Sequence, residues 1–218
     1  MSGWDESRHP RVPGGGVNGG QFTEKEMETA VGAATKAAGV GASELDRNLM
    51  EAARQISDLP QERALIFDPK TGEPAYWTDP ETGEVSLYLQ GDEHSVNVTT
   101  AEHDQMKGKV VMHNHPGGNP TFSSQDLITA RRLKTPLEVL VAGDWLIKAH
   151  QPKGGWPVID REFIFKHDLR MIGALTTSFR LEDLEKVRYT GAVSEELTKV
   201  LTYAYKNCGI EVTYERIR

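Results

Sequence analysis

The side chains with the clearest capacity for chemistry lie in one short stretch, residues 110–126. His113 and His115 end an apolar run, Ser123 follows after seven intervening residues, and Asp126 comes three positions later. Side chains alternate along an extended strand, so two histidines at positions i and i+2 lie on the same side. Imidazole and carboxylate groups are typical zinc ligands, and three protein ligands leave one tetrahedral position open. The spacing therefore predicts a catalytic zinc site made by His113, His115 and Asp126.

The segment between the second histidine and the serine must turn back for these ligands to meet. Residues 116–120 are rich in glycine and proline, which favour turns. After Ser123, apolar residues recur at helical spacing to about Lys134, and Pro136 closes the pattern. Ser123 is therefore expected at a helix N-terminus, with Asp126 three residues later as in a capping box.

The complete pattern, His-x-His, seven residues and then Ser-x-x-Asp, resembles the motif of the JAMM/MPN+ zinc metallopeptidases. Pro116 and the loop 117–120 are similar to the prokaryotic and phage branch of that family, especially the RadC-like proteins. The resemblance covers roughly residues 61–150. It implies an α+β fold with an MPN/JAMM (cytidine-deaminase-like) core, in which helices flank a mixed sheet. It also implies Zn²⁺ as cofactor and hydrolysis of a peptide or isopeptide bond, with a zinc-bound water as nucleophile.

The resemblance also implies a general base, because a glutamate upstream of the metal motif has this role in the family. Glu62 fits by position: it lies 51 residues before His113, after Pro60 and at the head of the apolar run 64–67. A carboxylate can take a proton from the attacking water and pass it to the leaving nitrogen. Ser123 resembles the family serine whose hydroxyl stabilises the oxyanion. The plainer alternatives are an exposed acid at a strand start for Glu62 and a simple helix cap for Ser123.

Composition narrows the function classes. The chain of 218 residues has a formal net charge of −7, which argues against a protein held to nucleic acid by its overall charge. Cys208 is its single cysteine, which excludes an intrachain disulfide and a multi-cysteine zinc site. There is no apolar run long enough to span a membrane, and the first residues lack the apolar core of a signal peptide. We therefore expect a cytoplasmic location, with phage association or non-classical export as alternatives.

The expected partner is a protein or peptide substrate, with a ubiquitin-like tail as one option. Pro136 follows Asp126 closely, so the long insertion of eukaryotic deubiquitinating relatives has no place there, which argues against ubiquitin itself. Residues 8–11 and 19–22 loosely resemble a segment of phage head-associated and mobile-element polyproteins, which is consistent with a phage or bacterial partner protein. Two alternatives stay open: a toxin-like or structural module of a phage or mobile element, and a RadC-like DNA-associated protein without peptidase turnover.

The sequence divides into four segments. Residues 1–23 are rich in proline and glycine and are expected to be a disordered tail; 24–60 form a helical N-terminal segment, 61–160 the metallopeptidase core, and 161–218 C-terminal helices with an edge strand. Strands are expected at 64–67, 73–77, 85–89, 95–99, 109–112, 137–142, 145–149 and 210–214. Helices are expected at 24–38, 44–58, 100–106, 124–134, 161–179, 181–187 and 194–206.

Overall fold

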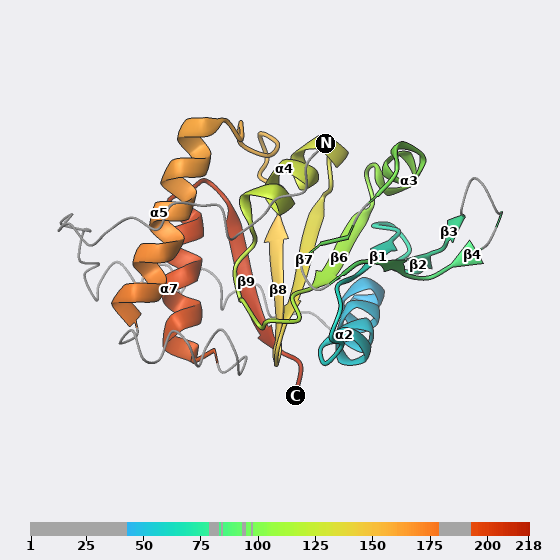
Figure 1. Ribbon diagram of the computed structural model, residues 1–218, viewed down its shortest axis with the longest axis horizontal. Helices are drawn as coiled ribbons and strands as arrows, with labels where there is room; N and C mark the ends of the chain where they lie inside the picture. Colours follow the sequence, from blue (N-terminus) through green and yellow to red (C-terminus); the bar gives the residue numbers. More distant parts are fainter. Residues whose placement is uncertain (1–42, 79–82, 84, 93–94, 97, 179–192) are drawn as a thin grey trace.

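A mixed β-sheet forms the centre of the molecule (Figure 1). The structure is a computed structural model that describes residues 43–78, 83, 85–92, 95–96, 98–178 and 193–218. The tail expected at 1–23 and the helices expected at 24–38 and 181–187 lie outside these ranges. The strand order is β2-β1-β6-β7-β8-β9, and β5 also pairs with β1. The strands of this sheet are β1 (Arg63–Phe67), β2 (Pro74–Ala75), β5 (Leu89–Gln90), β6 (Val110–Asn114), β7 (Leu137–Ala142), β8 (Trp145–His150) and β9 (Glu211–Arg216).

The pairing of β6 with β7 is parallel, whereas the other described pairs are antiparallel. The connection between these two parallel strands contains α4 (Ser124–Leu133), so the chain leaves β6, crosses over through a helix and returns beside it. This confirms the expected α+β class with a mixed sheet. The hairpin around Gly143 and the edge position of β9 are also as the sequence predicts.

Three of the expected strands are wrong in detail. The strand expected at 73–77 is divided, because β2 pairs with β1 while β3 (Trp77–Thr78) pairs with β4 (Val85–Ser86) in a separate two-stranded sheet. The strand expected at 85–89 is divided into β4, which pairs with β3, and β5, which pairs with β1. The described residues of the strand expected at 95–99 are not in a strand. The Asp92 side chain accepts from the Ser95 N–H, which favours a turn, and Thr99 caps the helix α3 (Thr100–Met106).

Helices cover both faces of the sheet. The helix α2 (Glu44–Ile56) begins at Ser43, which forms the expected N-cap with Asp46, and its buried residues pack on one face in a cluster with Leu65, Met112 and Val139. The opposite face is covered by α3, α4, α5 (Arg161–Ser178) and α7 (Glu195–Lys206). Figure 1 shows α5 and α7 side by side, with α7 next to β9, in agreement with their extensive contacts. Within the described residues, no helix has the length and apolarity needed to cross a bilayer.

Candidate metal centre

Three separate elements bring the expected ligands together. His113 is in β6, His115 follows directly after that strand, and Asp126 is in the first turn of α4. The possible ligand atoms of the three residues lie within 4.8 Å of one another. Asp126 Oδ2 is 3.7 Å from His113 Nε2 and 3.8 Å from His115 Nε2. Within the described part of the chain, this is the group of histidine, cysteine and acidic side chains close enough to share a metal ion.

The loop after β6 folds back because its backbone makes a tight turn. The His115 N–H donates to the carbonyl of Val141 in β7, and the Gly118 N–H donates to the carbonyl of His115, each at 2.9 Å. Gly118 has a φ of +69°, a conformation that glycine adopts without steric cost. His115 Nδ1 lies 3.0 Å from the Asn119 carbonyl. That contact holds the ring with its Nε2 directed at Asp126.

A capping box fixes the orientation of the Asp126 carboxylate. Ser123 Oγ accepts from the Asp126 N–H at 3.1 Å, and Asp126 Oδ2 accepts from the Ser123 N–H at 2.7 Å. The expected helix cap at Ser123 is therefore confirmed. The oxygen that takes part in the box is also the one nearest the two histidines, so the start of α4 places a ligand atom as well as ending the loop.

Glu138 is a further residue of this centre, and the sequence prediction missed it. It lies in β7, is 2% exposed, and its Oε1 is 3.4 Å from His113 Nδ1. The parallel register pairs Val111 with Glu138, so the Glu138 side chain projects to the same face as that of His113. A carboxylate next to Nδ1 of a histidine favours the tautomer that presents Nε2 to a metal. The sequence feature that could have identified Glu138 is a single acidic residue within an otherwise apolar strand.

The electrostatics of the site favour a positive charge between its acidic groups. Burial lowers the pKa of His113, but the carboxylates of Asp126 and Glu138 outweigh burial and raise it well above its usual value. Burial and the neighbouring His113 lower the pKa of His115 to about 4. Burial raises the pKa of Asp126, yet the two histidines and the Ser123 N–H hold it well below its usual value. Burial also raises the pKa of Glu138 to about 7, against the opposing effect of His113.

The distances between the ligand atoms fit a metal ion better than a hydrogen bond. A hydrogen bond from nitrogen to oxygen spans about 2.7–3.2 Å, which is shorter than the 3.7 and 3.8 Å observed. Zinc binds nitrogen and oxygen at about 2.0–2.2 Å, so two ligands at a tetrahedral angle are about 3.3–3.5 Å apart. His113 Nε2 is buried and makes no hydrogen bond. This nitrogen is therefore available as a ligand atom of a group that could hold a metal ion.

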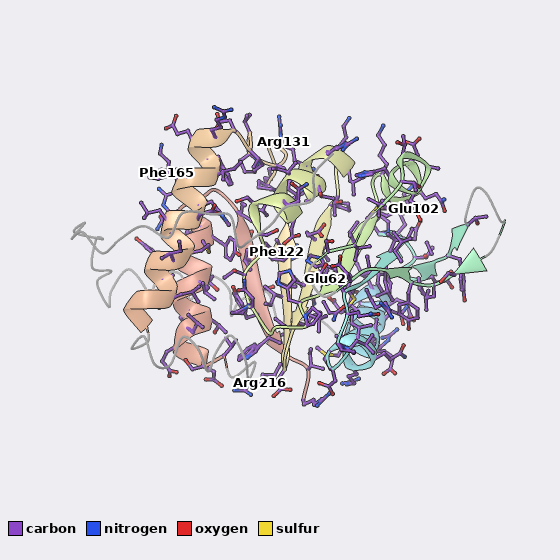
Figure 2. The ribbon with its side chains drawn as sticks, viewed as in Figure 1. Glu62, Glu102, Phe122, Arg131, Phe165 and Arg216 are labelled. Carbon is purple, nitrogen blue, oxygen red and sulfur yellow. The ribbon has the colours of Figure 1, made fainter. Side chains whose placement is uncertain are left out.

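Glu62 lies on the same face of the sheet as the histidines. It directly precedes β1 and is 8% exposed. The antiparallel register pairs Ala64 with His113, and directly opposite residues project to one face. Glu62 is two residues before Ala64, so alternation directs its side chain to the face of His113. Figure 2 shows Glu62 in the interior part of the view, whereas Glu102 lies at the periphery.

Comparisons with known proteins give no relative for this chain: no family model matches it, and no curated protein or solved structure does so. The fold and the site thus define an α+β protein with a candidate metal centre of two histidines and an aspartate. Any more specific function depends on the chemistry of the side chains themselves.

Proposed function

We propose that this chain is a zinc-dependent peptidase or isopeptidase of the JAMM/MPN+ type, related to its prokaryotic RadC-like branch. The observation that carries the proposal is the convergence of His113 Nε2, His115 Nε2 and Asp126 Oδ2 at separations suited to one metal ion. The His-x-His and Ser-x-x-Asp spacing supports it independently. Two nitrogens and one carboxylate oxygen form a ligand set that suits zinc, and three protein ligands are typical of catalytic sites.

The ion would supply the part of the chemistry that side chains alone lack. When bound, zinc would polarise the scissile carbonyl and lower the pKa of a water molecule from about 15.7 to about 7. His113, His115 and Asp126 would hold it. Glu138 beside His113 Nδ1 would keep the histidine in the tautomer that binds through Nε2.

Two further side chains would handle the proton and the developing negative charge. Glu62 takes the proton of the attacking water and delivers it to the leaving nitrogen, which is a role for a partly enclosed carboxylate. The Ser123 hydroxyl accepts from the Asp126 N–H, so its own hydrogen is available to donate to the carbonyl oxygen as charge builds on it. Ser123 thereby serves as helix cap and as oxyanion donor.

The substrate is a peptide or isopeptide bond within or between proteins. The test is a screen of a proteome-derived peptide library and of lysine-linked isopeptides with the zinc-loaded protein. We expect bound zinc at about one equivalent and cleavage that stops when the metal is removed by a chelator. Glu62→Gln should keep the zinc and lose about 100- to 10,000-fold in kcat, because general acid–base catalysis has this magnitude. His115→Ala should lose both zinc and activity.

Glu73→Gln is the matched control, because Glu73 is an exposed glutamate that precedes β2, at the end of β1 far from Glu62. It should retain zinc and full activity. Cleavage that survives both Glu62→Gln and His115→Ala would overturn the proposal. A zinc-loaded protein that binds a phage or bacterial partner and cleaves no library member would favour the toxin-like or structural module, and a salt-dependent DNA shift would favour a DNA-associated protein.

A further inference from the structure

Asn114 lies between the two histidine ligands and contacts the chain on both sides of Glu62. Its side chain is fully buried. Its Oδ1 accepts from the Arg63 N–H at 2.7 Å, and its Nδ2 donates to the Gln61 carbonyl at 3.2 Å. One amide side chain thus binds the peptide groups immediately before and immediately after the residue expected to be the base.

The peptide groups of Glu62 itself are held from the other side. The Glu62 N–H donates to the Asp92 carbonyl at 2.7 Å, and the Glu62 carbonyl accepts from the Gly91 N–H at 3.0 Å. Every main-chain polar group from the Gln61 carbonyl to the Arg63 N–H therefore has a hydrogen-bond partner. A segment held on both sides in this way does not fray as the first residues of a strand commonly do.

An amide side chain suits the position of Asn114 because the pairing of β6 with β1 ends at this point. The β1–β6 ladder ends at the Ala64–His113 pair, and the Arg63 N–H beside it donates to the Asn114 side chain. The Asn114 side chain fills the place of the missing main-chain partner. An amide offers one acceptor and one donor in the geometry of a peptide group, whereas ionised aspartate lacks the donor, alanine lacks both, and serine has both on a single oxygen.

We infer that Asn114 is a positioning residue that fixes Glu62 relative to the metal ligands on either side of Asn114 in the sequence. The inference rests on the proposed function, because it assigns Asn114 an effect that acts through the base. The end of β6, which carries His113 and leads directly into His115, also sets the place of Glu62, so the base and the metal keep a constant relation. Loss of the amide releases the start of β1 and leaves the metal ligands in place.

The kinetic test is a double-mutant cycle of Asn114→Ala and Glu62→Gln in the zinc-loaded full chain. Asn114→Ala alone should lower kcat by about 100-fold, which is the effect of displacing a catalytic group by about 1 Å. KM and zinc content should stay unchanged. In the Glu62→Gln background the same change should cost less than about twofold, because its effect passes through Glu62. A loss of equal size in both backgrounds would overturn the inference.

A second measurement does not depend on turnover. Amide hydrogen exchange of Arg63 in the metal-free protein should speed up at least about tenfold in Asn114→Ala, because that N–H loses its acceptor. Asn114→Asp keeps the acceptor and loses the donor, so it should retain more of the protection, and it replaces the alanine variant if that variant fails to fold. Unchanged Arg63 exchange in both variants would overturn the inference even if the protein hydrolyses nothing.

Asn48→Ala is the matched control, because Asn48 donates to the Gly72 carbonyl from α2 and has no contact with the metal centre. It should leave kcat, zinc content and Arg63 exchange unchanged. If no variant and no wild-type sample cleaves any substrate while Arg63 exchange responds as expected, the proposed function fails and the contact between Asn114 and the start of β1 stands. If hydrolysis requires zinc and Glu62 but is indifferent to Asn114, the positioning role fails alone.

Discussion

Zinc binding should release a proton, and that proton should come from His113. In the metal-free site at neutral pH, the carboxylates of Asp126 and Glu138 raise the pKa of His113 well above its usual value, so the ring is protonated. Burial and the charge of His113 lower the pKa of His115 to about 4, so that ring is already neutral. A metal ion binds only the neutral imidazole. The two histidines should therefore differ, although both are proposed ligands of the same ion.

The difference between the two histidines sets how strongly zinc affinity depends on pH. One proton displaced per metal ion makes the affinity rise about tenfold, or about 1.4 kcal/mol, for each unit of pH while His113 is protonated in the free protein. The number of protons released per metal ion can be measured by calorimetric titration. The metal-free protein is titrated with Zn²⁺ at pH 7.5 in buffers of different ionisation enthalpy. At that pH the Glu138 carboxyl, with a pKa of about 7, is about three-quarters ionised and contributes at most about a quarter of a proton. The His113 proton adds about one to the fraction of a proton that a zinc-bound water of pKa about 7 releases at this pH, so we expect about one to two protons for the wild type.

His113→Gln and His115→Gln form a matched pair, since each leaves one imidazole and the Asp126 carboxylate. Both should weaken zinc binding. His115→Gln should release about as many protons as the wild type, whereas His113→Gln should release about one proton fewer, because the contribution of the bound water is common to all three proteins. The reasoning is refuted if the wild type and His113→Gln release the same number of protons, or if the count falls in His115→Gln and not in His113→Gln.

Three further changes have distinct expected results. Glu138→Gln should weaken zinc binding about 10- to 100-fold in a chelator competition, because a histidine ligand loses its orienting carboxylate. Ser123→Ala should cost about 0.5–2 kcal/mol in urea unfolding of the metal-free protein, and Ser43→Ala should cost a similar amount, but only Ser123→Ala should also weaken zinc binding. Tyr205→Phe should cost about 1–3 kcal/mol in the same assay, because the buried Phe122 N–H donates to the Tyr205 hydroxyl.

Much of the fold could be predicted because its signals are local. The apolar run 137–142, the turn at Gly143 and the apolar run 145–149 are sufficient to predict the β7–β8 hairpin. Capping residues likewise located the starts of α2 and α4. The region of β2 and β3 was predicted less well, since strands of two residues carry almost no periodicity and their partners are chosen by tertiary contacts.

The candidate ligands could be named for the same reason, since His-x-His and Ser-x-x-Asp each follow from the alternation of a strand or the first turn of a helix. The roles of Glu138 and Asn114 could not be predicted from such local patterns. Glu138 reaches His113 only because β7 lies parallel to β6 in one particular register, and that register is a property of the whole sheet. The role of Asn114 depends on the point where β6 leaves β1, which the sequence does not mark.

The contacts of Glu138 and Asn114 divide the site into two parts with separate signatures. Glu138 contacts a histidine ligand, so its loss should appear first in zinc affinity and in the proton count. Asn114 contacts main chain beside Glu62, so its loss should appear in kcat at full zinc occupancy. Both contact the end of β6 or the chain beside it, yet in the proposed mechanism one would act through the metal and the other through the base. If a substitution of either residue changed zinc affinity and kcat equally, the end of β6 would move as a single unit.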